Sequence, residues 1–259
     1  MSEMRLDKPT IASKFSREQG QLLALQRMQN LEIYYQWSYD LFKPFIGRRI
    51  LDAGCGLGNF TAIAKKDAEY ILAVDSSSKN IQILEDRFRN SAVVEIAQVD
   101  LESDNYSVPV KQIDTIVCLD VLEHFYDDVA LLERFFKIVQ AGGHLLVKVP
   151  ACKWLFGSID VASGHNRRYT LEELRIKAEL AGWETIKVHY MNIAGVFPYW
   201  VRCRVLKKGV NFSRTFKTWQ LNAVRRLMPI VKSFDNIIGP PIGQSAILIA
   251  RKPKKRNSD

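Results

Sequence analysis

Strand-length segments, most of them apolar, alternate with amphipathic stretches along the middle of the chain. The segments lie at 50–53, 70–74, 93–99, 113–120, 144–151, 182–190 and 245–250. Between them, apolar residues recur every three or four positions, as at 129–139 and 171–181, which predicts helices. Near-continuous apolar strands alternating with helices are typical of a parallel sheet buried on both faces. The pattern therefore predicts an α/β fold.

The first 48 residues carry a different pattern. Residues 1–15 are polar and are expected to form a loose arm, and the spacing of apolar residues over 16–43 predicts a helix. This helix carries an aromatic cluster made of Tyr34, Tyr35, Trp37, Tyr39 and Phe42. We expect the cluster to pack on the sheet; the alternative is that it lines a substrate entrance.

A glycine turn joins the first apolar segment to a helix. The stretch 49–61 reads RILDAGCGLGNFT, with Gly54, Gly56 and Gly58 in the turn. Strand, glycine turn and helix form the opening unit of an α/β nucleotide-binding sheet, but the spacing G-x-G-x-G differs from the dinucleotide form G-x-G-x-x-G. The strand also ends with Asp52, whose carboxylate would repel a pyrophosphate and suit an ammonium group.

This stretch resembles motif I of the class I S-adenosylmethionine-dependent methyltransferases, whose D/E-x-G-x-G-x-G is matched by Asp52 and the three glycines. The resemblance implies a Rossmann-like, seven-stranded, mostly parallel sheet and S-adenosyl-L-methionine as cofactor. In this fold a modest loop usually joins strands six and seven, whereas here residues 193–243 separate them and predict a helical insert. Asp75, at the end of the second strand, is placed to accept hydrogen bonds from ribose hydroxyls. The resemblance implies that Asp100 and Leu101, after the third strand, contact the adenine. The cofactor-binding candidates are Asp52, Gly54, Gly56, Gly58, Asp75, Ser76, Asp100, Leu101, Asp120 and Val121.

Candidates for catalysis follow the fourth and fifth strands. The segment D-V-L-E-H ends at His124, and the long segment 155–170 contains G-H-N-R-R-Y-T. A G-H-x-R-R-Y-T loop after strand five resembles a bacterial methyltransferase subgroup associated with cell-surface glycans or lipid-linked sugars. If the acceptor is a hydroxyl, a histidine base would help to remove its proton, and Asp160 is expected to orient His165. The candidate catalytic residues are His165, His124, Arg168 and Tyr169; the alternative is that this loop is held only by structural hydrogen bonds.

The segment 193–243 separates the last two predicted strands and is rich in aromatic and basic residues. Residues 187–259 hold 15 Lys and Arg against two acids, whereas residues 1–186 hold 22 against 26. Three interpretations remain open: an anionic membrane surface or lipid-linked substrate, a cap or oligomer contact over the site, and nucleic acid, which is disfavoured because no RNA-binding module is recognisable.

At 259 residues the chain has room for one core. We expect a single methyltransferase domain with an N-terminal helical segment (1–48), a core (49–192 and 244–252), the insert (193–243) and a tail (253–259). The start lacks the apolar run of a signal peptide, and no stretch is apolar enough to span a membrane. The four separated cysteines indicate reduced structural thiols and no zinc site. We expect a cytoplasmic protein, peripheral on the inner membrane face if the insert binds lipid, and predict no metal ligands.

The predicted reaction is methyl transfer, with an oxygen of a lipid-linked or glycan-type acceptor preferred. A small soluble aromatic or polyketide-like hydroxyl is the alternative acceptor. An NAD(P)-dependent oxidoreductase and a non-catalytic cofactor-binding protein are the alternatives of other classes; the glycine spacing and Asp52 argue against the first.

Overall fold

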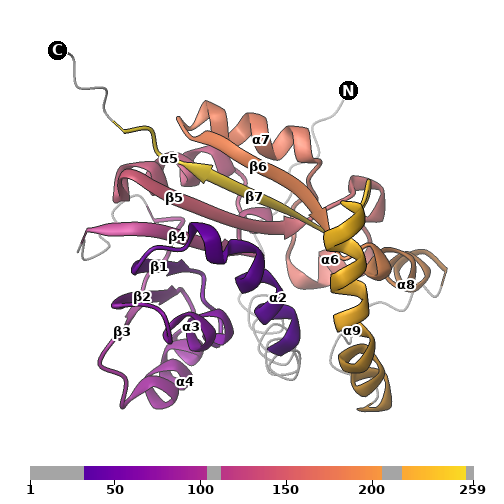
Figure 1. Ribbon diagram of the computed structural model, residues 1–259, viewed down its shortest axis with the longest axis horizontal. Helices are drawn as coiled ribbons and strands as arrows, with labels where there is room; N and C mark the ends of the chain where they lie inside the picture. Colours follow the sequence, from indigo (N-terminus) through magenta and orange to yellow (C-terminus); the bar gives the residue numbers. More distant parts are fainter. Residues whose placement is uncertain (1–31, 104–111, 206–217, 255–259) are drawn as a thin grey trace, which may run out of the picture.

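The computed structural model describes residues 32–103, 112–205 and 218–254, and its centre is a seven-stranded sheet (Figure 1). The strands are β1 (Arg49–Ala53), β2 (Tyr70–Asp75), β3 (Val94–Gln98), β4 (Ile113–Leu119), β5 (Val139–Pro150), β6 (Glu184–Met191) and β7 (Ser245–Arg251). Their order is β3-β2-β1-β4-β5-β7-β6. The pairs among β1 to β5 are parallel, and β7 is antiparallel to both β5 and β6. The predicted fold class is confirmed.

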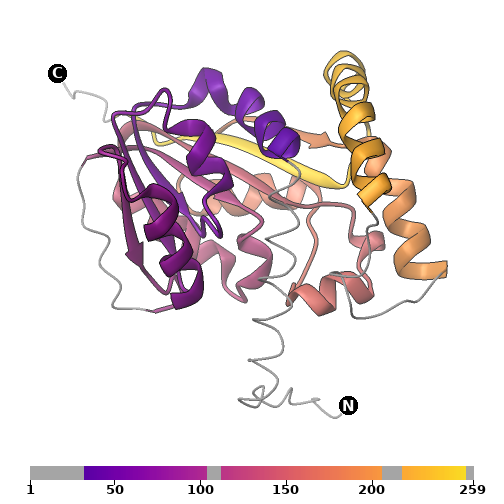
Figure 2. The same ribbon diagram turned by 90° about the horizontal axis from the view of Figure 1, so that it is seen from below.

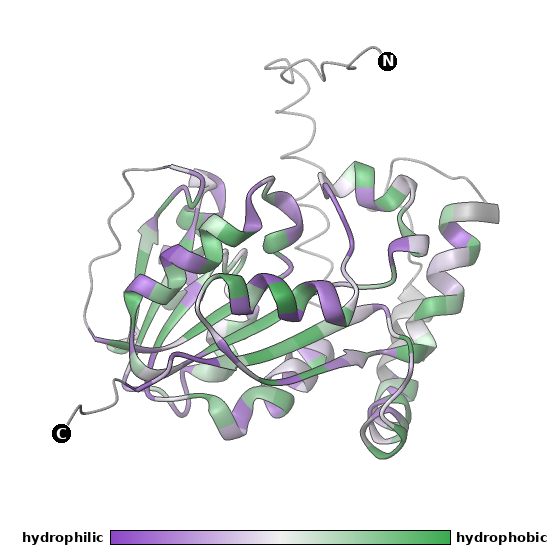
Figure 3. Ribbon diagram, turned by 90° about the horizontal axis from the view of Figure 1, so that it is seen from above, coloured by the Kyte–Doolittle hydropathy of each residue, from purple (hydrophilic) through white to green (hydrophobic). Residues whose placement is uncertain are grey.

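Helices cover both faces of the sheet (Figure 2). Those described are α2 (Glu32–Phe42), α3 (Asn59–Ala64), α4 (Ser78–Phe88), α5 (Asp128–Ile138), α6 (Ser158–Ser163), α7 (Leu171–Leu180), α8 (Val196–Trp200) and α9 (Thr218–Ile238). α5 and α7 pack on one face through residues such as Phe135 and Leu174. α2 and α3 pack on the other, where Trp37, Phe42 and Phe60 are buried against the strands. The aromatic cluster of α2 therefore packs on the sheet, as expected, and the strands between these layers are hydrophobic along most of their length (Figure 3).

Two predictions about secondary structure are wrong. β5 begins at Val139, directly after α5, and not at residue 144. The glycines there continue the strand: the Gly142 N–H donates to the Lys252 carbonyl, and a Cβ on Gly143 would lie 2.5 Å from the Asp114 carbonyl oxygen. The segment 155–170, predicted as a loop, contains α6, whose first turn is closed by a hydrogen bond from the Gly157 N–H to the Asp160 carboxylate.

Other predicted elements agree with the structure. Thr170 caps α7 by accepting a hydrogen bond from the Glu173 N–H at 3.2 Å, as predicted. All four cysteines are free. Of the predicted N-terminal helix, only the part from Glu32 onward is described; residues 16–31 lie outside the described residues.

The insert between β6 and β7 is helical where it is described. α8 follows β6, and α9 precedes β7, which pairs with the end of β5 through Ser245 and Pro150. The carboxylate of Asp235 on α9 accepts hydrogen bonds from the N–H groups of Asn192 and Ile193, so α9 is fastened at the end of β6. The insert therefore stands beside the carboxyl edge of the parallel strands. Its predicted aromatic and basic residues at 206–217 lie outside the described residues, and none of the described helices is long and apolar enough to cross a membrane.

Candidate active site at the carboxyl edge of the sheet

The glycine turn after β1 adopts a backbone that favours glycine at three positions. Gly54, Gly56 and Gly58 have φ values of +70°, +58° and +71°, in the left-handed region that side chains with a Cβ rarely enter. A Cβ on Gly54 would lie 2.5 Å from a methyl group of Val121. The turn therefore brings its backbone close to the end of β4 and leaves a surface without side chains for a ligand.

Two carboxylates flank this turn. Asp52 is buried, and the Thr61 hydroxyl donates to it at 2.5 Å; burial raises its pKa from 3.8 to about 6. Asp75, at the end of β2, accepts hydrogen bonds from the Gly56 N–H at 2.9 Å and from the Asn80 side chain at 3.0 Å. Burial also raises the pKa of Asp75, although its hydrogen bonds oppose the rise. Asp75 thus holds the turn in its bent conformation.

Three further cofactor candidates lie along the same edge. Ser76 is exposed directly after β2. After β3, Asp100 is exposed and accepts a hydrogen bond from the Glu102 N–H, and Leu101 is buried. The fold therefore brings the strand-end candidates to one edge, as the parallel topology requires. Their contacts with a cofactor stay predictions.

An ion pair between a buried lysine and a partly exposed aspartate lies beside this edge and was not predicted from the sequence. The ammonium group of Lys148, only 1% exposed in β5, lies 2.5 Å from the carboxylate of Asp120 and 4.6 Å from the centre of the Tyr34 ring. Burial opposes the charge of Lys148, but the attraction of Asp120 outweighs it and raises the pKa of the lysine. Asp120 itself has a φ of +56°. A lysine within an otherwise apolar strand was the available sequence signal, since a buried charge needs a partner.

Two histidines meet next to Glu123. His124 lies in the 3₁₀ turn Leu122–His124 after β4, and His165 follows α6. Their rings pack edge to face with centres 5.0 Å apart. His165 Nδ1 lies 3.0 Å from Asp160 Oδ1, so the predicted contact between these residues is present. His124 Nδ1 lies 3.1 Å from the Gly164 carbonyl oxygen, and burial lowers the pKa of His124 to about 4.

Glu123 is fully buried within this group. Its Oε1 lies 3.8 Å from His165 Nε2, and neither carboxyl oxygen receives a hydrogen bond from another side chain that the structure describes. Burial raises the pKa of Glu123 well above its ordinary value. Asp160 differs: burial alone would raise its pKa, but hydrogen bonds and the nearby Arg168 charge outweigh burial and lower it.

Arg168 and Tyr169 do not fit the catalytic roles expected for them. Arg168 is 3% exposed, and its guanidinium donates to Asp160 at 2.8 Å and to the Ala151 carbonyl at 2.8 Å. The hydroxyl of Tyr169, which is fully buried, donates to Asp128 at 2.7 Å. Because both side chains direct their donors to protein groups, we correct the expectation and treat them as positioning residues. Arg167 is also tied to Asp128, at 3.3 Å.

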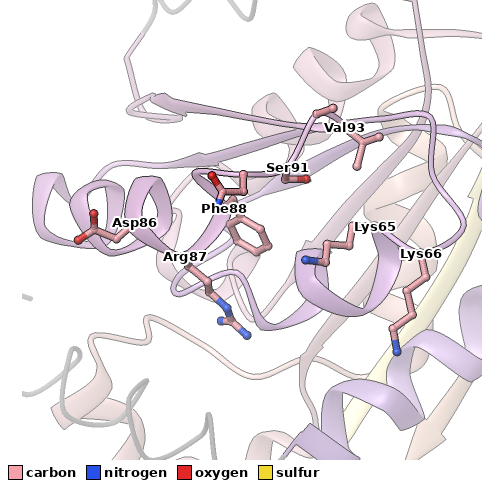
Figure 4. A pocket seen from close by; sticks show the side chains of 9 residues that line it. Lys65, Lys66, Asp86, Arg87, Phe88, Ser91 and Val93 are labelled. Carbon is pink, nitrogen blue, oxygen red and sulfur yellow. The ribbon is translucent and has the colours of Figure 1, made fainter.

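A hollow of about 400 Å³ lies elsewhere, at the ends of α3 and α4 (Figure 4). Lys65, Arg87, Phe88 and Val93 are among the residues that line it, and none of the candidate site residues does. We therefore assign it no part in the site.

The residues present suit S-adenosylmethionine. Its adenosine moiety and aminocarboxypropyl chain need a turn without side chains and acids that bind the ribose and ammonium groups. Because the cofactor contains no pyrophosphate, the site needs no positive charge to bind one. The turn built by Gly54 and Gly56, with Asp52 beneath it and Asp75 beside it, meets these needs. Fold and site together define a class I S-adenosylmethionine-dependent methyltransferase.

A family model for a methyltransferase domain matches residues 27–188, more than half of the sequence, and the chain belongs to this family. It is 27% identical over 138 residues to a ubiquinone biosynthesis O-methyltransferase of Pectobacterium carotovorum, covering 52% of this chain and 56% of that protein. The corresponding enzyme of Neisseria meningitidis is 25% identical over 136 residues, covering 51% and 56%. The chain thus spans about half the length of the curated relatives it matches.

Among solved structures, a phosphoethanolamine N-methyltransferase of Haemonchus contortus in complex with S-adenosyl-L-methionine superposes with a TM-score of 0.58. The identity is 21%, and the match covers 84% of this chain and 52% of that one. At this identity the likeness shows the fold alone.

Proposed function

We propose that this methyltransferase transfers the methyl group of S-adenosylmethionine to an oxygen of a lipid-linked or glycan-type acceptor. The observation that carries the proposal is the group around His165 at the carboxyl edge, where an acceptor hydroxyl can be activated. The names of the curated relatives, which are O-methyltransferases, support an oxygen acceptor. The loop G-H-N-R-R-Y-T, which includes this histidine, resembles that of the glycan-associated subgroup and supports the acceptor class.

S-adenosylmethionine supplies a methyl group already activated on a sulfonium. In the transfer, an acceptor oxygen forms a bond to the methyl carbon while the electrons of the carbon–sulfur bond return to sulfur. The protein must then bind, align and activate, and alignment alone contributes on the order of 7–11 kcal/mol. Asp52 would hold the ammonium group and Asp75 the ribose, while Asp100 and Leu101 would contact the adenine.

Activation of the acceptor falls to His165. If its Nδ1–H donates to Asp160, the Nε2 atom carries the lone pair and faces the space next to Glu123 and His124. Asp160 is further fixed by Arg168 and by the hydroxyl of Tyr199, at 2.8 and 2.9 Å. The arrangement therefore holds one orientation of the imidazole, with a basic nitrogen available to a hydroxyl.

The insert supports an acceptor at a membrane surface. On α9, Leu227, Ile230, Phe234 and Ile237 are 57, 67, 52 and 81% exposed and recur every three or four residues, so they share one face. On α8, Phe197 is 69% exposed and stacks on Trp200. An apolar face of this kind on a basic segment is typical of helices that lie in the membrane interface. We propose that this surface places the protein peripherally on an anionic membrane.

The test compares two glucosides that differ only in the alkyl chain, together with a small aromatic hydroxyl compound. S-adenosylhomocysteine release would be measured with dodecyl glucoside, methyl glucoside and catechol, with and without anionic vesicles. We expect transfer to the long-chain glucoside, stimulated by vesicles, and its loss in His165→Ala with cofactor binding retained. Exclusive methylation of catechol, unaffected by vesicles, would support the small soluble acceptor instead. Absence of S-adenosylmethionine binding in calorimetry would contradict the methyltransferase function.

The proposed membrane contact of the insert is tested by a separate variant. Replacing Ile230, Phe234 and Ile237 by serine should abolish sedimentation with anionic vesicles and leave methyl glucoside turnover unchanged. Leu180→Ser is the matched control, because Leu180 is 69% exposed on α7, away from the insert. Equal sedimentation of the triple variant and the control would mean that this face only packs against protein.

A further inference from the structure

Three potential metal ligands converge beside the cofactor edge. Glu123, His124 and His165 each offer one ligand atom, and these atoms lie within 4.8 Å of one another. Two of them come from the 3₁₀ turn after β4, and the third comes from the segment after α6. The backbone also ties the two segments, because the Asn166 N–H donates to the Glu123 carbonyl at 2.8 Å and the Asn166 side chain donates to the His124 carbonyl at 2.6 Å. The cluster is thus a product of the fold.

Both imidazoles are held through the same nitrogen. His165 Nδ1 faces the Asp160 carboxylate at 3.0 Å, and His124 Nδ1 faces the Gly164 carbonyl at 3.1 Å. Since both partners only accept hydrogen bonds, the proton of each neutral ring belongs on Nδ1, which leaves the lone pair on Nε2. Metal-bound histidines are usually oriented in this manner, with the second nitrogen donating to a carboxylate or a backbone carbonyl.

The buried carboxyl group of Glu123 is a second observation, independent of the histidines, that points to a bound ligand. Its side chain is 0% exposed, and among the described residues no other side chain hydrogen-bonds either carboxyl oxygen. Such a buried, unpartnered carboxyl group is costly. The charges of Lys148 and Arg168 attract the carboxylate, but burial outweighs them, and the Lys148 ammonium group is bonded to Asp120 and not to Glu123. A cation bound by Glu123 and the two Nε2 atoms would satisfy all three groups.

We propose that Glu123, His124 and His165 bind one divalent cation of the Zn²⁺, Co²⁺ or Mn²⁺ type. Two imidazoles and one carboxylate suit these ions better than Mg²⁺, which prefers oxygen ligands. With ligand bonds of about 2.0–2.2 Å, two ligand atoms of one tetrahedral ion lie about 3.3–3.6 Å apart. The 3.8 Å between Glu123 Oε1 and His165 Nε2 is slightly longer than this, and the wider pairs of the cluster, within 4.8 Å, have to close by up to about 1 Å when the ion binds.

No metal ligands were predicted from the sequence, because His165 lies in a different segment from Glu123 and His124 and only the fold around α6 brings it to them. Three protein ligands leave coordination positions open, as in catalytic sites. For its chemical use, the cation site rests on the proposed function: an acceptor hydroxyl bound there would lose its proton to solvent more easily and present its oxygen to the methyl group. The lone pair of His165 would then hold the ion and would not take the proton itself.

Metal binding can be measured without turnover. The full-length protein, freed of metal with a chelator, would be titrated with Co²⁺ and followed by its visible absorption, and Zn²⁺ would then be added as competitor. We expect one Co²⁺ per chain, displaced by Zn²⁺, and a higher melting temperature of the loaded protein. Glu123→Gln and His165→Asn should each remove the signal, and Asp160→Asn should weaken affinity about 10–100-fold because it only positions a ligand. His144→Gln is the control, because His144 lies outside the cluster.

Each outcome decides one point. Two ligand variants are used so that a fold defect in one, seen by circular dichroism, leaves the other informative. A Co²⁺ signal that survives both folded variants, or no binding at all, overturns the cation site. If methyl transfer persists after chelation, the proposed function stands and His165 acts as a base alone. If Co²⁺ binds as expected but no oxygen acceptor is methylated, the proposed function fails and the cation site remains.

Discussion

Replacing Asp52 by asparagine is expected to stabilise the protein at neutral pH and to weaken cofactor binding. Asp52 is 2% exposed, and burial raises its pKa from 3.8 to about 6. Because each pKa unit corresponds to about 1.4 kcal/mol, ionising Asp52 in the folded state costs about 3 kcal/mol of stability above pH 6. Asparagine carries no charge and keeps an oxygen for the Thr61 hydroxyl.

The sign follows from the raised pKa. The stability that the folded protein keeps while Asp52 is protonated is fully present below the pKa of the unfolded state, near 4. It is lost as the pH rises through the folded-state pKa of about 6. The free energy of unfolding of Asp52→Asn, relative to the wild type, should therefore increase by about 3 kcal/mol between pH 4 and pH 7.

Urea denaturation without cofactor, at half-unit pH steps, measures this difference. Glu85→Gln, an exposed acid on α4, serves as the control. In calorimetry, Asp52→Asn should bind S-adenosylmethionine about 10- to 100-fold more weakly, the cost of one charge-assisted hydrogen bond. A stability difference that is flat with pH would refute the burial argument, and unchanged affinity would refute the ammonium contact.

Three further substitutions test the site. Asp120→Asn leaves the buried Lys148 without its partner and should cost about 1–3 kcal/mol in urea denaturation, less than for a fully buried pair because the Asp120 side chain is 43% exposed; a cost below about 0.5 kcal/mol would show that water already solvates the lysine. Tyr169→Phe removes the hydroxyl that donates to Asp128 and to the Leu122 carbonyl and should cost about 1–3 kcal/mol with turnover reduced less than tenfold, whereas a loss of 1,000-fold at full stability would restore its catalytic role. Gly54→Ala should abolish S-adenosylmethionine binding in calorimetry, and full binding by this variant would contradict the close contact with Val121.

The parts of the site that sequence predicted are those governed by local pattern and topology. The glycine turn follows from its spacing, and Asp75 and Asp100 reach one edge because parallel strands end together. The apolar strand around Lys148 indicated a buried charge but not its partner, and nothing in the local sequence indicated that Glu123 is buried. Their environment depends on which strand and which turn lie next to them in space, and this is decided by packing.

The same reasoning explains why the segment 155–170 was misjudged. Its polar residues suggested side chains that point toward a substrate, but several of them bind the buried Asp160 instead. The Asp160 carboxylate accepts hydrogen bonds from the Gly157 N–H, the Arg168 guanidinium and the Tyr199 hydroxyl, and its Oδ1 faces His165 Nδ1. Tyr199 belongs to α8 of the insert, whose neighbour Phe197 is exposed. One buried carboxylate therefore connects the histidine at the reacting edge to the helix that carries the apolar surface.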